Sequence, residues 1–208
     1  MKKFLFPVFI ILVMFIVSCR AAPTAVEAPP ARPPVRPPVP EIPTYIMGMG
    51  RMQAEQMSSF LLNINPGADT AFVENLVLIY IEEAAIEGVN HDTAFAQMCL
   101  ETGYLRFGNL VVPEQYNFAG LGAIGPGQPG LSFPDPRIGV RAHIQHLKAY
   151  GSIEPLEQEL VNPRYRFVRR GSSPTISGLA GTWAADPRYA EKIYDILEKL
   201  YDYAYNIL

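Results

Sequence analysis

Nine prolines between residues 21 and 43 constrain the fold of this chain more than any other feature of its sequence. Proline lacks a backbone N–H and fixes φ, so this stretch cannot continue a helix or a sheet ladder. It also has almost no large apolar side chains with which to build a core. We therefore expect residues 20–44 to be a linker, extended over roughly 70 Å. The folded domain is then expected over residues 45–208.

Residues 1–19 have the pattern of an export signal. Two lysines precede an apolar run over residues 4–17, and Ser18 and Cys19 follow it. At about 1.5 Å per residue the run is too short to cross a hydrocarbon core of about 30 Å. A small residue before a cysteine at this position resembles a bacterial lipoprotein signal, in which the cysteine carries lipid. An ordinary signal or a short uncleaved anchor is the alternative.

This pattern predicts an exported chain, attached to a membrane through lipid on Cys19 and facing the periplasm or the cell surface. The net charge of -3 and the lack of a basic stripe argue against a nucleic-acid partner. Hydrophobic residues make up 49% of the chain and charged residues 18%, which is typical of a globular protein. We expect a monomer without a cofactor.

The folded part is expected to be mostly helical. Asp69 or Thr70, Asn90, Asp135 and Asp186 each stand where a helix N-cap is expected. Residues 104–134 are rich in Gly and Pro and have no helical period, so they suit a loop or a small hairpin lobe. The expected helices cover residues 49–62, 70–88, 91–102, 135–151 and 174–181, and a last one that starts at 186 and has an apolar face.

Glu101 is the residue most suited to acid catalysis. Helical spacing puts it on one face with Ala94, Gln97 and Met98. Partial desolvation and the negative end of the helix dipole would both raise its pKa. A carboxylic acid that stays protonated near neutral pH donates a proton to a leaving oxygen. A solvated glutamate at a helix end is the alternative interpretation.

Four segments around Glu101 resemble a known family in their order along the chain. Residues 94–104 read AFAQMCLETGY, residues 115–123 read QYNFAGLGA, residues 133–147 begin FPD and end GVRAHIQHL, and residues 179–193 begin LAGTWA and end DPRYAEKI. Together they resemble the bacterial glucosaminidases of glycoside hydrolase family 73 over about residues 75–200. The residues after Tyr104 depart from the pattern, because many relatives have a shorter turn there.

The resemblance implies a lysozyme-like α+β fold with a groove for the glycan strands of peptidoglycan. It makes Glu101 the general acid, acting on the bond at the reducing side of N-acetylglucosamine. The side chains that it implies as substrate contacts are Tyr104, Asn117, Phe118, Trp183 and Tyr189. Packing in the core is an equal alternative for Trp183 and a partial one for Tyr189.

A second catalytic group is less evident. Glycosidases pair two carboxyl groups, about 5–5.5 Å apart for retention and about 6.5–9.5 Å for inversion. Glu114 is our candidate, because it lies just before the segment that contains Asn117. Asp135 competes with it, although capping a helix accounts for that residue. The acetamido group of the substrate offers a route without a second carboxylate.

The remaining reactive side chains do not form a second site in the sequence. Cys99 lies off the face of Glu101 and is expected to be a buried hydrophobe. His143 and His146 are one helical turn apart, but no third ligand accompanies them, so we expect no metal.

The leading interpretation is a peptidoglycan hydrolase, an endo-β-N-acetylglucosaminidase that cleaves β-1,4 bonds. A lytic transglycosylase would use the same acid, and an amidase would need zinc ligands. A glycan-binding envelope lipoprotein without activity, or a scaffold for an envelope machine, would need no acid at all.

Overall fold

The computed structural model describes residues 38–108, 110–125 and 127–207, all within one compact unit. The export signal, Cys19 and most of the linker lie outside the described residues. Among the helices that are described, none has the length and apolar content needed to cross a membrane.

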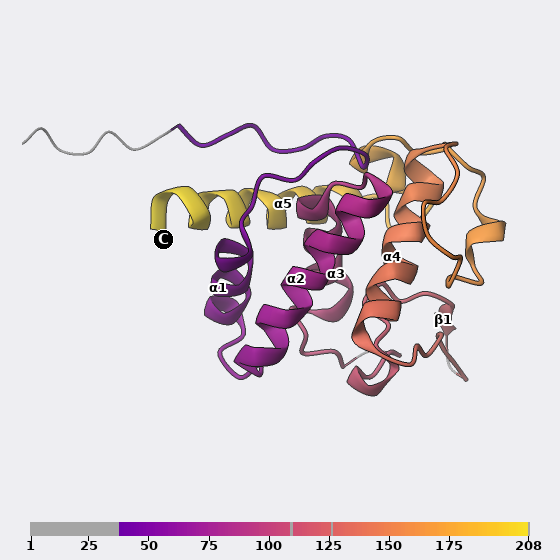
Figure 1. Cartoon of the computed structure of the whole chain (residues 1–208), viewed down its shortest axis with the longest axis horizontal. Helices are drawn as coiled ribbons and strands as arrows, with labels where there is room; N and C mark the ends of the chain where they lie inside the picture. Colours follow the sequence, from indigo (N-terminus) through magenta and orange to yellow (C-terminus); the bar gives the residue numbers. More distant parts are fainter. Residues whose placement is uncertain (1–37, 109, 126, 208) are drawn as a thin grey trace, which may run out of the picture. The chain divides into compact units, whose positions relative to one another are not determined.

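The described residues form a helical domain with a small lobe, as the sequence predicts (Figure 1). The lobe contains the antiparallel strands β1 (Ala123–Gly125) and β2 (Gln128–Pro129), in which Ala123 pairs with Pro129 and Gly125 with Gln128. Short 3-10 turns are η1 (Pro113–Gln115), η2 (Tyr165–Phe167) and η3 (Ile176–Leu179), and a π-helical turn η4 (Tyr203–Ile207) ends the chain. The α-helices are α1 (Ala54–Ile64), α2 (Thr70–Glu87), α3 (His91–Thr102), α4 (Pro136–Gly151) and α5 (Tyr189–Asp202).

Helix α3 is the centre of the domain. Residues 92–99 and Thr102 are buried, so the helix is enclosed on nearly every side. Helices α2, α4 and α5 all pack on it, and α5 runs crosswise to the other two in Figure 1. A helix that is enclosed in this way is shielded from solvent except where it ends. The end of α3, which contains Glu101, is therefore where the core meets the surface.

The predicted N-caps of α2, α3 and α4 are confirmed. The side chain of Asp69 accepts a hydrogen bond from the backbone of Phe72 at 2.7 Å, and that of Asp135 accepts from Ile138 at 2.9 Å. Asn90 accepts from the first turn of α3 in the same way. Each cap satisfies a backbone N–H that the first turn of a helix leaves without a partner.

The predicted starts of α1 and α5 are wrong, and the helix expected over residues 174–181 is the shorter 3-10 turn η3. Helix α1 begins at Ala54 instead of residue 49, because the backbone N–H groups of Arg51 and Met52 donate to the buried carboxylate of Asp92 at 2.7 and 3.1 Å. Helix α5 begins at Tyr189 instead of 186. Asp186 closes a local turn by accepting from the backbone of Arg188 at 2.9 Å.

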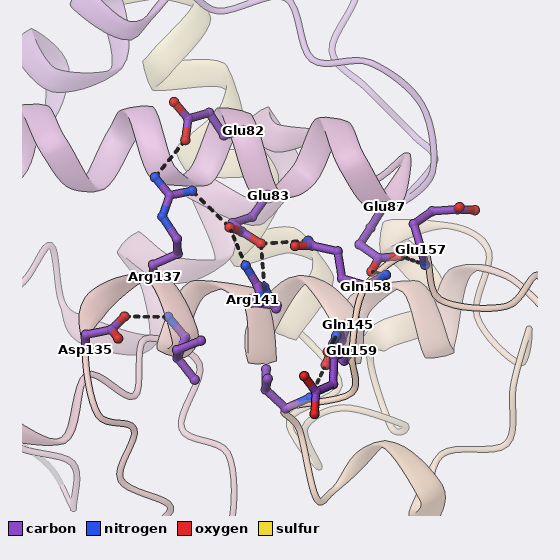
Figure 2. Close-up of polar contacts among 12 residues, drawn as sticks. Glu82, Glu83, Glu87, Asp135, Arg137, Arg141, Gln145, Glu157, Gln158 and Glu159 are labelled. Carbon is purple, nitrogen blue, oxygen red and sulfur yellow. Dashed lines mark hydrogen bonds and ion pairs between the residues drawn. The ribbon is translucent and has the colours of Figure 1, made fainter.

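A cluster of charged residues joins α2 to α4 (Figure 2). Glu83 accepts hydrogen bonds from Arg137, Arg141 and Gln158 at 2.8–3.2 Å. These bonds lower the pKa of Glu83, although desolvation by burial opposes them. The cluster fixes α4 against α2, and α4 supplies side chains to the candidate site.

One turn further along α2, Glu87 forms a buried ion pair with Lys148 at 2.8 Å. Its carboxylate also accepts from the backbone N–H groups of Glu157 and Gln158 at 3.0 and 3.1 Å. The same group therefore holds the segment after α4 to the helical domain.

Candidate active site

Glu101 lies in the last turn of α3, beside a cavity of about 190 Å³. Gly103 ends the helix in the left-handed conformation, with φ of 57°, as the sequence predicts. Besides Glu101, the cavity is lined by Phe107, Leu110, Val111, Gly120 and Ala123. Among the described residues of the lining, the carboxyl group is thus the only ionisable group, and the others are apolar or glycine.

The turn that follows α3 is held by Thr102. Its hydroxyl donates to the carbonyl of Met98 at 2.8 Å and accepts from the backbone of Leu105 at 2.9 Å. Its own carbonyl accepts from the backbone of Phe107 at 2.7 Å. Leu105 and Phe107 have φ values of 62° and 56°, which non-glycine residues seldom adopt. This strained turn brings the ring of Phe107 to the cavity wall.

Burial raises the pKa of Glu101, since the cavity removes water from the charged form more than from the neutral form. Hydrogen bonding from Tyr189 and Trp183 lowers the pKa, but by less, so the net direction is upward. Glu101 therefore keeps its proton to a higher pH than an exposed glutamate. This is the property that a general acid needs.

A chain of buried hydrogen bonds leads to Glu101 through four helices. The hydroxyl of Tyr189 donates to Oε1 of Glu101, and Nε2 of Gln97 donates to that hydroxyl at 2.8 Å. Oε1 of Gln97 lies 2.8 Å from Nε2 of His143, and Nδ1 of His143 lies 2.9 Å from the hydroxyl of Tyr80. All four supporting side chains are buried. We call them the relay.

The relay has one direction. Burial lowers the pKa of His143 to about 3, so its ring is neutral and carries one N–H. Because Nε2 faces the carbonyl oxygen of Gln97, that N–H is on Nε2, and Nδ1 accepts from Tyr80. Every donor in the relay then points toward Glu101. Such a chain of dipoles orients the carboxyl group and stabilises its ionised form.

Gly120 faces the other carboxyl oxygen. A Cβ atom at this position would lie 3.4 Å from Oε2 of Glu101, and the residue has a φ of 61°. A side chain here would be strained and would crowd the oxygen that the relay leaves uncommitted. The glycine therefore leaves the space beside Oε2 free of a side chain.

A second cavity, of about 210 Å³, shares Gly120 and Ala123 with the first. Trp183 lines it, and the indole ring also packs against His146 and Tyr150, with ring centroids 4.9 and 5.6 Å away. Trp183 is half-buried. It therefore packs on one side and lines a cavity on the other, and its contact with a sugar stays a prediction.

Comparison with known sequences identifies the family. The profile described as mannosyl-glycoprotein endo-beta-N-acetylglucosaminidase matches residues 77–202, which is more than half of the chain. The chain belongs to the glucosaminidase family. An uncharacterized protein of Borreliella burgdorferi is 44% identical over 159 residues, which cover 76% of this chain and 78% of that protein.

A solved structure is similar at a lower level. The crystal structure of S. aureus autolysin E in complex with the muropeptide NAM-L-Ala-D-iGlu has 16% sequence identity and a TM-score of 0.48. The similarity covers 76% of this chain and 71% of that one.

Asn117 and Phe118 of this glucosaminidase do not line the cavity, in contrast to what the resemblance implies. The side chain of Asn117 is 1% exposed and bonds within the lobe, to Leu121 and Leu131 at 2.9–3.0 Å. Phe118 is also 1% exposed and packs edge-on against Tyr80. Asn117 therefore holds the lobe together through these bonds, and Phe118 packs into the core of the helical domain.

Tyr104 likewise makes its contacts within the helical domain. Its ring meets that of Phe60 with the centroids 6.2 Å apart, and its carbonyl accepts from the side chain of Asn65 at 2.8 Å. Tyr189 contacts Glu101 directly, but from inside the domain. In this glucosaminidase it positions the acid, because its proton is donated to Glu101 and its side chain is buried away from the cavity.

Glu114 is exposed in η1 and does not belong to the lining of either cavity. Asp135 is occupied in capping α4. Glu114 as the second carboxylate stays a prediction that the described geometry does not support.

The relay is what sequence reasoning missed. Helical spacing put Gln97 on the face of Glu101, and that was a usable signal. His143 was considered only as a metal ligand, whereas both of its ring nitrogens are engaged in the relay. Within the part of the chain that the structure describes, no group of three acidic, His or Cys side chains could hold a metal ion. Cys99 is buried, as predicted.

Proposed function

We propose that this glucosaminidase is a peptidoglycan hydrolase, an endo-β-N-acetylglucosaminidase that cuts β-1,4 bonds with Glu101 as general acid. The observation that carries the proposal is the environment of the Glu101 carboxyl group. It lies at a cavity, its pKa is raised by burial, and one of its oxygens is fixed by the relay. Membership of the glucosaminidase family gives this arrangement a glycan as its substrate.

The two oxygens of Glu101 have separate tasks in this proposal. Oε2, which faces Gly120, donates its proton to the glycosidic oxygen as the C–O bond breaks. Oε1 becomes part of a carboxylate that already accepts a hydrogen bond from Tyr189. The donor stabilises the charge as it forms, and it requires no rearrangement at that moment.

We further propose that the acetamido group of the substrate takes the part of the second carboxylate. Glu101 is the only carboxyl group in the described lining of the cavity. The acetamido oxygen would attack the anomeric carbon, and water would then open the ring that this attack forms. A lytic transglycosylase would instead leave anhydro-sugar ends, so the products distinguish the two reactions.

Digestion of purified peptidoglycan tests the function. The wild type is expected to release fragments with N-acetylglucosamine at the new reducing end, identified by mass spectrometry after reduction. Glu101→Gln is expected to lower the rate by about 10²–10⁴, the usual share of a general acid. Glu114→Gln is the matched control and is expected to change it less than about threefold.

Three results would overturn parts of the proposal. Unchanged digestion by the Glu101→Gln variant would exclude this residue as the acid. Anhydro ends would replace hydrolysis by transglycosylation. A large loss in Glu114→Gln would restore the second carboxylate and remove the need for the acetamido route.

A further inference from the structure

Arg164 is the one charged group among the described residues that line the cavity beside Trp183. The neighbouring His146 adds no charge near neutral pH, because burial and the nearby Arg164 lower its pKa to about 4. Since this cavity shares Gly120 and Ala123 with that of Glu101, an extended ligand in one reaches the other. The combined groove therefore has an acid at one end and a guanidinium at the other.

Arg164 has no carboxylate partner among the described residues. Its guanidinium lies 4.9 Å from the centroid of the Phe167 ring, which is a contact that neutralises none of its charge. The surrounding residues 162–173 contain four arginines and no acidic residue, although the chain as a whole has a net charge of -3. The positive charge of this segment thus favours an anion, although the net negative charge of the chain would repel one.

The backbone at Arg164 is fixed to α4. The side chain of Asn162 is fully buried, and its Oδ1 accepts from the N–H of Arg164 at 2.9 Å. Its Nδ2 donates to the carbonyl of Ala142 at 3.1 Å and lies 2.9 Å from Nδ1 of His146. This buried amide anchors the root of the arginine side chain, so a ligand there would meet a prearranged cation.

We propose that Arg164 binds a carboxylate that branches from the glycan beside the bond to be cut. The proposal rests on the glycan-cleaving function above and names the substrate more narrowly. Every second sugar of a peptidoglycan strand bears a lactyl group, which is a free carboxylate in peptide-free strands and the root of an acidic peptide otherwise. A chitin-type chain of N-acetylglucosamine has neither. Arg164 thereby selects wall glycan over neutral glycan.

Substrate selectivity tests the assignment. The measured quantity is the ratio of kcat/KM on peptide-bearing glycan to kcat/KM on neutral N-acetylglucosamine oligomers. Arg164→Gln is expected to lower this ratio about tenfold, the usual effect of losing one charge-assisted hydrogen bond. Arg164→Lys should recover part of it, because the charge returns without the planar fork. The exposed Arg169, from the same segment, supplies the control Arg169→Gln, with an unchanged ratio.

Peptide-free strands separate the two sources of the carboxylate. A tenfold effect on peptide-free strands as well assigns the lactyl carboxylate, and an effect confined to peptide-bearing strands assigns the peptide. An equal loss on all three substrates would mean that Arg164 only maintains the structure, and it would overturn the proposal. No loss on any of them would overturn it as well.

A binding measurement keeps the test independent of catalysis. Trp183 is the only tryptophan of the chain and lines the same cavity, so its fluorescence reports occupancy. In the Glu101→Gln background, adding Arg164→Gln is expected to weaken the binding of peptide-bearing fragments about tenfold more than the binding of neutral ones. If the wild type cleaves no glycan, the proposed function fails while this titration still decides the anion site. Equal weakening of both ligands would contradict it.

Discussion

At the scale of single residues, the burial of Glu101 and the hydrogen bond that it accepts from Tyr189 together set the pH range in which the acid works. A hydrogen bond donated to a carboxylate favours its ionised form and so lowers its pKa. Burial raises the pKa by more. The pKa of Glu101 is thus the balance of two opposing effects. A substitution at Tyr189 removes one of them, the hydrogen bond, and leaves the burial in place.

Tyr189→Phe should raise the pKa of Glu101 further. Activity needs the protonated acid, so it falls as the pH rises through this pKa. The alkaline limb of the kcat/KM profile is therefore expected to move to higher pH, while kcat at the optimum decreases because the carboxylate product of the first step loses its donor. The pH dependence of kcat and kcat/KM measures both effects.

Tyr194→Phe is the matched control, since Tyr194 lies on the same helix and no hydrogen bond of its hydroxyl supports the acid. Its profile should equal that of the wild type. An alkaline limb that moves to lower pH in Tyr189→Phe would contradict the role of the tyrosine as a donor to Glu101.

The residue scale also shows how far a sequence can be interpreted. Glu101 was identifiable because its helical spacing and its motif agree. Asn117 was not, because an amide suits a sugar hydroxyl and a backbone carbonyl equally well. Only the fold shows that Leu121 and Leu131 already use its donor and acceptor atoms. A motif therefore identifies a residue that matters without stating which partner it meets.

At the scale of elements, helix caps were predictable and the segments between them were not. Asp69, Asn90 and Asp135 act within their own first turns, so local sequence suffices for them. The start of α1 depends instead on Asp92, which is about forty positions away along the chain. The relay is a stronger case, because it needs one side chain from each of α2, α3, α4 and α5.

The buried pair of Glu87 and Lys148 is expected to be a large contributor to the packing of α2 on α4. Glu87→Gln leaves the buried ammonium group of Lys148 with only the exposed carboxylate of Glu157, 3.9 Å away, as a counter-charge, which costs about 3–5 kcal/mol of unfolding free energy. Urea denaturation followed by circular dichroism measures this loss. The exposed pair of Lys192 and Asp186 provides the comparison, since Lys192→Ala should lower the free energy of unfolding far less.

Equal losses of unfolding free energy in the two variants would show that burial does not determine how much each ion pair contributes to stability. The structure predicts inequality because water screens the surface pair and is excluded from the other. Figure 2 shows why the buried site matters beyond its own strength: the segment after α4, which leads to Arg164, is tied to the same carboxylate.

At the scale of the whole molecule, the candidate site is assembled from parts far apart in sequence. Glu101 comes from the end of α3, Gly120 from the lobe and Trp183 from the segment before α5. All of them belong to the described compact unit. Recognition and cleavage should therefore be properties of this unit, and attachment to a membrane a property of the residues before it.

Cys19→Ala tests that division of roles in the full chain. We propose that the wild type is exported and carries lipid on Cys19. A single acyl chain binds membranes only marginally, whereas two or more hold a protein stably. The variant is therefore expected to leave the membrane fraction almost completely. It should digest solubilised peptidoglycan at the wild-type rate, because no residue of the candidate site is changed, and it should digest intact walls less when produced at the same level in cells.

Fractionation with intact-mass analysis measures the loss of the variant from the membrane, and the release of wall fragments measures the two digestion rates. A wild-type chain that begins at Cys19 with no added mass would refute the anchor and leave the catalytic proposal untouched, since the two depend on separate parts of the molecule.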